Sequence, residues 1–302
     1  MAQQPPERID GQVVSNGEAQ GAPERNPEAH ASGRPHAGFK NLGLRLRSAA
    51  IFAPPVFAAV YFGSPWFDIL VVAAALMMTW EWSRMCSGGQ FTLVGWAMEA
   101  CVAISLLALY VDQLMLALSV AVVTAGFAGG IALARRHDSP GRIALGAMLI
   151  SLFCLAFIWI RAFPGAGLEL VVWLVLAVWF TDAGGYFFGR SIGGPKLAPR
   201  ISPNKTWAGL AGGILLAVIW SCVWLVWHGG QELLPVIIAA VAIAVLAQAG
   251  DLSVSAVKRR FGVKDTGGLI PGHGGVLDRL DGMLLTGPTA AFVLVLSGKG
   301  WI

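Results

Sequence analysis

Long apolar runs constrain this chain more than any other feature of its sequence. A transmembrane helix needs about 20 predominantly apolar residues, and hydrocarbon leaves no alternative to a helix because it cannot hydrogen-bond an exposed backbone. Nine runs are candidates, of which the first and last are short: Ala49–Phe62, Phe67–Trp82, Phe91–Val111, Leu114–Ala134, Ile143–Phe163, Leu168–Phe188, Trp207–Trp227, Leu233–Ala249 and Met283–Leu296. The sequence therefore predicts an all-α, polytopic transmembrane helical bundle of about nine helices.

The composition agrees with a membrane protein. Charged residues make up 13% of the 302 residues, whereas soluble globular domains carry about 25%. The four cysteines lie in or beside apolar runs, without a CxxC pair or zinc-ligand spacing, and we interpret them as buried, reduced thiols. The net charge of +4 is modest, and we expect no nucleic-acid partner.

The basic residues predict the orientation in the membrane. If the N-terminus is cytoplasmic and nine helices follow, 19 of the 21 Lys and Arg residues lie on the cytoplasmic side, and only Arg161 and Lys299 do not. Basic loops remain cytoplasmic. We therefore expect an integral protein of a bacterial cytoplasmic (inner) membrane, with a cytoplasmic N-terminus.

Three regions can be distinguished. Residues 1–38 are polar and contain no aromatic side chain, so they cannot bury enough apolar surface to offset the entropy of ordering, and we predict a disordered tail. Residues 39–178 form the N-terminal transmembrane helices. Residues 179–302 form a C-terminal transmembrane region in which two polar cytoplasmic loops, Thr181–Thr206 and Gly250–Gly282, carry the candidate chemistry.

The second loop mixes acidic and basic residues. Its acids are Asp251, Asp265, Asp278 and Asp281, and its bases are Lys258, Arg259, Arg260, Lys264 and Arg279. Carboxylates bind hard divalent cations, and Lys and Arg neutralise phosphates, so the mixture suits a magnesium-bound polyphosphate. Asp278 and Asp281 share a helix face at spacing i, i+3. The alternative is that these acids only neutralise the neighbouring bases.

Two further features have equally plain alternatives. Gly272-His273-Gly274-Gly275 offers backbone N–H groups to a phosphate, or is simply a flexible turn. In the first loop, Asp182 lies inside an apolar run, where an acid without a partner is costly, and Arg190 is a candidate partner. The bases Lys196, Arg200 and Lys205 form an anion site or act only as topology signals.

The second loop resembles the signature of the phosphatidate cytidylyltransferase (CDP-diacylglycerol synthase) family. The resemblance extends over about 27 residues: Ser255-x-x-Lys258-Arg259, Lys264-Asp265, Pro271-Gly272-His273-Gly274-Gly275 and Asp278-Arg279-x-Asp281. Positions from Trp179 onward also look like the family: Asp182, Tyr186, Gly189-Arg190, Leu197, Ser202-Pro203, Lys205-Thr206 and Gly250-Asp251-Leu252. One position departs from it, because Ala208 stands where members often carry Glu.

The resemblance implies a nucleotidyltransferase that converts CTP and phosphatidic acid to CDP-diacylglycerol and pyrophosphate in phospholipid biosynthesis. On this reading Asp251, Asp278 and Asp281 hold Mg²⁺; Lys205, Lys258, Arg259 and Lys264 contact phosphates; His273, Gly274 and Gly275 shape the triphosphate pocket; Ser202, Thr206 and Ser255 add hydroxyl contacts; and Asp182 and Arg190 lie near the lipid phosphate. A second, monovalent cation and a homodimer remain open.

Two rival functions fit less well. A CDP-alcohol phosphotransferase also uses clustered aspartates, but its D-G, A-R and paired D-x-x-x-D pattern does not occur here. A transporter would place polar groups near the bilayer midplane and show internal repeats, whereas the polar residues of this chain cluster in the two loops.

Overall fold

A computed structural model of the chain describes residues 37–111, 114–269 and 274–297. The chain divides into two units, residues 1–40 and 41–302. The predicted tail lies almost wholly outside the described residues, so the description below concerns the second unit. Its elements are α1 (Ala37–Phe62), α2 (Trp66–Cys86), α3 (Leu93–Tyr110), α4 (Leu114–Ala134), α5 (Pro140–Arg161), α6 (Gly167–Ser191), β1 (Lys196–Ala198), β2 (Ser202–Thr206), α7 (Trp207–Trp227), α8 (Leu233–Arg260), α9 (Leu277–Leu280) and α10 (Met283–Ser297).

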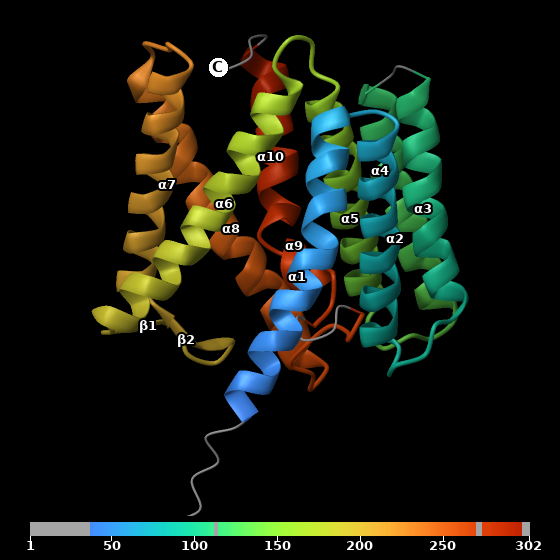
Figure 1. The fold of residues 1–302 in the computed structure, drawn as a ribbon. Coiled ribbons are helices and arrows are strands. Elements are labelled where there is room, and N and C mark those ends of the chain that lie inside the picture. The colour runs from blue at the N-terminus through green and yellow to red at the C-terminus, as the bar shows by residue number, and fades with distance from the viewer. Residues whose placement is uncertain (1–36, 112–113, 270–273, 298–302) are drawn as a thin grey trace, which may run out of the picture. The chain divides into compact units, whose positions relative to one another are not determined.

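The predicted polytopic helical architecture is confirmed (Figure 1). Among the described residues, seven helices, α2 to α8 in chain order, are long and apolar enough to cross a membrane. Two shorter apolar helices, Ala50–Phe62 and Met283–Leu296, correspond to the first and last predicted spans. The number nine therefore stays a prediction.

Helices continue well into both predicted loops, and this corrects their boundaries. α6 runs to Ser191 and α8 runs to Arg260, whereas we expected these helices to end near Phe188 and Ala249. The segment after Gly250 is polar but amphipathic, because it buries Val254, Ser255 and Lys258 and exposes Ser253, Arg259 and Arg260. Three basic residues in the last turn of α8 also suit the negative end of the helix dipole.

The polar segment between α6 and α7 contains a short hairpin, so the fold is not strictly all-α. β1 pairs antiparallel with β2, with Lys196 opposite Thr206 and Ala198 opposite Ser202. The Thr206 side chain then caps α7 by accepting a hydrogen bond from the Gly209 N–H at 3.0 Å. The hairpin thus leads directly from one membrane helix into the next.

Glycine permits close approach of the helices that carry the polar residues. A Cβ atom on Gly250 of α8 would lie 2.5 Å from the Asp281 carbonyl oxygen, and one on Gly213 of α7 would lie 2.7 Å from the Thr181 carbonyl oxygen. No side chain fits at such distances. Gly250 therefore allows the α8 backbone to lie directly against the segment that contains Asp281.

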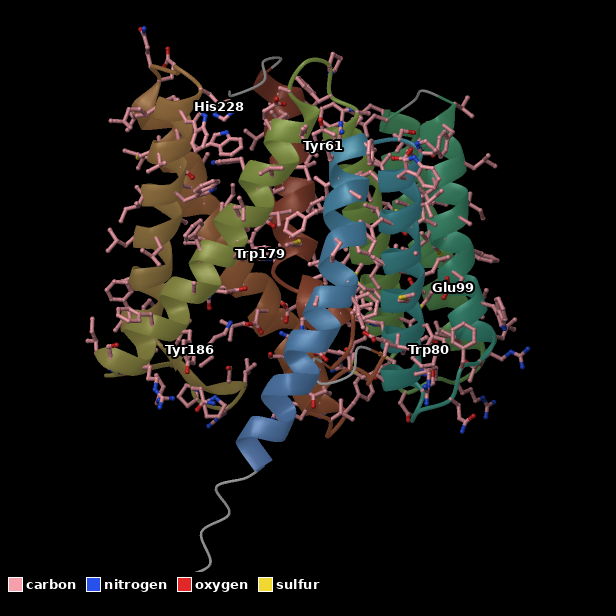
Figure 2. All side chains as sticks on the ribbon, in the orientation of Figure 1. Tyr61, Trp80, Glu99, Trp179, Tyr186 and His228 are labelled. Carbon is pink, nitrogen blue, oxygen red and sulfur yellow. The ribbon has the colours of Figure 1, made fainter. Side chains whose placement is uncertain are left out.

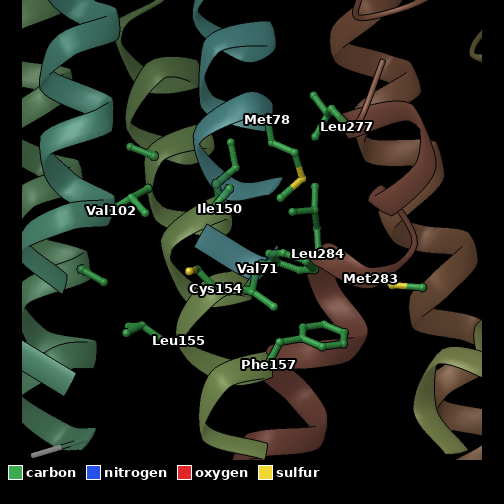
Figure 3. Packing of buried hydrophobic residues seen from close by; sticks show 14 of the residues in the cluster. Val71, Met78, Val102, Ile150, Cys154, Leu155, Phe157, Leu277, Met283 and Leu284 are labelled. Atoms are coloured by element: carbon green, nitrogen blue, oxygen red, sulfur yellow. The ribbon is translucent and has the colours of Figure 1, made fainter. Parts of the chain in front are cut away.

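The apolar core joins the two halves of the sequence. Met78 of α2, Ile150 and Phe157 of α5, Leu277 of α9 and Leu284 of α10 are all buried in one cluster (Figure 3). α2 is also tied to α5 by the Trp82 indole, which donates to the Arg142 carbonyl oxygen at 3.0 Å. α2 and α5 therefore pack in one core with α9 and α10, next to the C-terminal polar region.

Candidate active site

The polar face of α8 contributes three residues to the candidate site. Asp251, Ser255 and Lys258 are spaced at i, i+4 and i+7, which places them on one side of the helix. The Ser255 hydroxyl donates to Asp251 Oδ1 at 3.1 Å. Lys205 at the end of β2 reaches the same carboxylate, with its Nζ 2.6 Å from Asp251 Oδ2. The hairpin and α8 therefore meet at a carboxylate–ammonium pair.

A second ion pair joins α8 to α9. Lys258 Nζ lies 2.7 Å from Asp278 Oδ1, and both side chains are nearly buried, with exposed fractions of 10% and 7%. Asp278 Oδ2 accepts hydrogen bonds from the Thr266 N–H at 2.9 Å, the Thr266 hydroxyl at 3.0 Å and the Gly275 N–H at 3.1 Å. Asp278 thus holds together the helix end, the preceding loop and α9.

These contacts decide the ionisation of Asp278. Burial alone would raise the pKa of its carboxyl group, but the Lys258 hydrogen bond, the Thr266 and Gly275 N–H groups and the Lys258 charge outweigh burial and hold that pKa below its usual range. Asp278 is therefore an anion at neutral pH.

Asp281 has different surroundings. Burial and the negative charges of Asp251 and Asp182 raise the pKa of its carboxyl group, against the opposing effects of Lys258 and of the Gly282 N–H, which donates to Asp281 Oδ1 at 2.8 Å. Asp182, which is exposed on α6, in turn feels the charges of Asp251, Lys205 and Arg279. Asp182, Asp251 and Asp281 therefore form a cluster in which each ionised carboxylate disfavours ionisation of its neighbours.

The predicted magnesium ligands are only partly brought together. Within the described ranges, no three His, Cys, Asp or Glu side chains converge closely enough to hold a metal ion. Asp251 and Asp281 act on each other electrostatically, but both oxygens of Asp278 are already engaged. A third carboxylate, that of Asp182, interacts electrostatically with both Asp251 and Asp281. The resemblance suggested Asp182 only as a neighbour of the lipid phosphate.

Other predicted site residues have structural contacts. Thr206 is buried as the cap of α7. The Arg259 guanidinium lies at the end of α8, where it donates to the carbonyl oxygens of Ile201, at 3.3 Å, and Val263, at 3.4 Å. Arg190 and Lys264 are exposed, and Ser202 is half-buried in β2.

The glycine-rich segment is partly described. Gly274 has a φ of +83°, a left-handed conformation that favours glycine, and Gly275 donates its N–H to Asp278. Both therefore shape the Asp278 cluster. His273 and the two residues before it lie outside the described residues.

Sequence reasoning missed two residues of this cluster. Thr266 contacts Asp278 through both its N–H and its hydroxyl. Glu81, nearly 200 positions away in the chain, accepts hydrogen bonds from the same hydroxyl and from the start of α9. The only signal in the sequence is an acidic residue inside an apolar run.

A cavity of about 510 Å³ adjoins the cluster. It lies between the end of α2 and residues 261–269, and Thr266 forms part of its wall. On the α2 side, the Arg84 guanidinium lies 4.3 Å from the centre of the Trp80 ring and donates to the Gly89 carbonyl oxygen at 2.7 Å. The volume of this cavity is within the range of small-molecule binding sites.

The Lys258–Asp278 pair predicts an asymmetric effect of mutation. Lys258→Met leaves a nearly buried carboxylate without its counter-charge, so the free energy of unfolding should fall by about 3 kcal/mol. Adding Asp278→Asn removes that charge and should restore part of the loss. Thermal unfolding of the purified protein in detergent measures both, with Lys264→Met as an exposed control. Equal melting temperatures for Lys258→Met and wild type would contradict the prediction.

Comparisons with known proteins show what the chain is similar to. The model of the cytidylyltransferase family matches residues 43–297. A phosphatidate cytidylyltransferase of Brucella suis is 37% identical over 266 residues, which cover 86% of this chain and 94% of the relative. One from Bacillus subtilis is 41% identical over 160 residues, or 53% of this chain and 60% of the relative. One from Haemophilus influenzae is 41% identical over 130 residues, or 41% and 45%.

The match to the family model includes the membrane helices on both sides of the site as well as the polar segments. With an apolar helical scaffold, two lysine–carboxylate pairs and a glycine-shaped loop at one end of it, this chain belongs to the cytidylyltransferase family.

Proposed function

We propose that this protein is a phosphatidate cytidylyltransferase, which transfers CMP from CTP to phosphatidic acid. The observation that carries the proposal is the pairing of Lys205 with Asp251 and of Lys258 with Asp278, inside a chain that matches relatives of this name over most of its length. An oxygen of the lipid phosphate attacks the α-phosphorus of CTP, and the bond from that phosphorus to the β-phosphate oxygen breaks. CDP-diacylglycerol and pyrophosphate are the products.

The reaction makes a particular demand on the site. The lipid phosphate is already anionic near neutral pH, so no strong general base is required, and the main barrier is the repulsion between two polyanions. Lys205 and Lys258 supply positive charge where the described structure is otherwise rich in carboxylates. In the proposed reaction their ammonium groups neutralise the phosphates and orient them for in-line attack.

Magnesium fits the donor set near Asp281. Asp182 and Asp251 raise the pKa of Asp281 by charge repulsion, and a divalent cation would relieve that repulsion. We propose that Asp251 and Asp281 hold Mg²⁺ with Asp182 beside them, and that Asp278 joins them only if it gives up contacts with Lys258 and Thr266. When bound, Mg²⁺ would neutralise phosphate charge and polarise the phosphoryl group. The proposal leaves open whether a second, monovalent cation also binds.

The proposed reaction has a direct test. Purified protein should convert labelled CTP and phosphatidic acid to a lipid-soluble nucleotide with release of pyrophosphate, and an excess of EDTA should stop turnover. A chelator that removes divalent cations should not change the turnover of a metal-independent enzyme. Failure to form a lipid product from these substrates would refute the assignment, and full turnover in EDTA would refute the metal requirement alone.

Two aspartates of the same segment should respond differently to loss of charge. Asp281→Asn keeps the size of the side chain but removes an anionic oxygen, and should reduce turnover at least a hundredfold if it binds the cation. Asp265→Asn is the matched control, because Asp265 is exposed on the preceding loop, and it should have a milder effect. Steady-state rates across a magnesium titration decide between them, and near-normal turnover of Asp281→Asn at limiting magnesium would remove Asp281 from the metal site.

We also propose that the site end of the bundle faces the cytoplasm of a bacterial cell, where CTP is available. The 19-to-2 distribution of basic residues supports this orientation. Cysteines introduced as Ser191→Cys and Ser297→Cys, in a background without the four native cysteines, should react with an impermeant maleimide from opposite sides of the inner membrane. Reaction of both from the same side would refute the nine-helix topology.

A further inference from the structure

Glu81 is the most completely buried acidic side chain of α2, and its partners all come from the far end of the sequence. None of its surface is exposed. Its Oε1 accepts the Val276 N–H at 2.9 Å, and its Oε2 accepts the Leu277 N–H at 2.9 Å and the Thr266 hydroxyl at 3.0 Å. Two of the three donors are backbone N–H groups at the beginning of α9, which a four-residue helix cannot satisfy by itself.

The surroundings of Glu81 are shaped to admit the loop backbone. A Cβ atom on Gly267 would lie 2.9 Å from Glu81 Oε1, and one on Gly275 would lie 2.6 Å from the same oxygen. Only glycine allows the backbone to approach the carboxylate this closely. Two separate points of the loop, one on either side of residues 270–273, therefore lie directly against one side chain.

Glu81 also connects to the proposed catalytic groups. The Thr266 hydroxyl oxygen is 3.0 Å from both Glu81 Oε2 and Asp278 Oδ2, and Asp278 Oδ1 is 2.7 Å from Lys258 Nζ. The result is a continuous polar chain from α2 to α8. Burying a carboxylate is costly without such partners. Loss of Glu81 would leave the Val276 and Leu277 N–H groups without their acceptor, whereas the Thr266 hydroxyl would still have Asp278.

We propose that Glu81 is a positioning residue that holds Thr266 and the start of α9, at Val276 and Leu277, against α2, and thereby sets the geometry of Asp278 and Lys258. α2 suits this role because the neighbouring Trp82 is fully buried and is hydrogen-bonded to α5. The effect on catalysis rests on the proposed function, whereas the anchoring of the loop does not. An N-terminal membrane helix would then contribute to the site without touching either substrate.

Hydrogen exchange tests the anchoring without substrates. Glu81→Gln keeps one acceptor oxygen but turns an NH₂ group toward the donors, so the Val276 and Leu277 amides should exchange at least tenfold faster in the full-length protein. Mass spectrometry of peptides that cover residues 274–282 provides the measurement. Glu99→Gln is the matched control, since Glu99 is half-buried on α3 and is not an acceptor of these donors (Figure 2). Unchanged exchange in a folded Glu81→Gln protein would overturn the proposal.

Steady-state kinetics test the consequence for the site. Glu81→Gln should lower kcat at least tenfold while the KM for CTP changes less than threefold, because orientation is lost rather than a substrate contact. Glu81→Asp, which keeps the charge, should recover part of the rate, and Glu99→Gln should match wild type. If Glu81→Gln does not fold, Thr266→Val replaces it: this variant should lower kcat, and Thr266→Ser should restore it.

The combined outcomes separate the two proposals. Faster exchange with unchanged kcat would overturn the positioning role. Faster exchange in a protein whose wild type shows no cytidylyltransferase activity would uphold the anchor and refute the proposed function instead. General destabilisation would be indicated if Glu81→Asp had a kcat as low as Glu81→Gln, and Thr266→Ser a kcat as low as Thr266→Val. That outcome would also overturn the positioning role.

Discussion

The contact between Lys258 and Asp278 determines the arrangement of the polar end of this protein. A charge in a nearly buried position is tolerated only when it is paired and hydrogen-bonded. Here each partner belongs to a different element, since Lys258 lies in the last turn of α8 and Asp278 lies in α9, which leads to α10. The other carboxylate oxygen of Asp278 accepts hydrogen bonds from the Thr266 and Gly275 backbone N–H groups. One ion pair therefore organises two helices and the loop that joins them.

The apolar runs made most of the fold predictable, because the bilayer leaves an apolar segment of that length no alternative to a helix. α4 and α7 begin and end where the sequence predicted. The end of α8 was missed because polarity was interpreted as loop, although Val254 and Lys258 are buried on one helix face. The hairpin was missed as well, since Lys196–Ala198 and Ser202–Thr206 are too short to show an alternating pattern.

The sequence predicted which residues belong to the candidate site better than it predicted how they contact one another. The resemblance identified Asp251, Lys258, Asp278 and Asp281, but spacing along a chain does not reveal which acid pairs with which base. Glu81 illustrates the limit: its partners are 185 to 196 positions away, and nothing local distinguishes it from Glu99 on the next helix. Only the tertiary packing of α2 against α9 shows that it accepts three hydrogen bonds.

The ion pairs give the site a balance of charge that bears on how polyanions would enter it. Lys205 and Lys258 each face a carboxylate in the structure, so a phosphate group that binds either lysine must compete with an aspartate already in place. In the proposed reaction, the carboxylate displaced from its lysine becomes available to the cation that accompanies CTP. Asp251 and Asp281 would then hold the cation, Lys205 and Lys258 would contact the phosphates, and Mg²⁺, when bound, would supply compensating positive charge. A triphosphate without its metal would bring further negative charge to Asp182, Asp251 and Asp281, which already act on one another electrostatically, so under the proposed function these carboxylates would favour the metal-bound nucleotide over the free one.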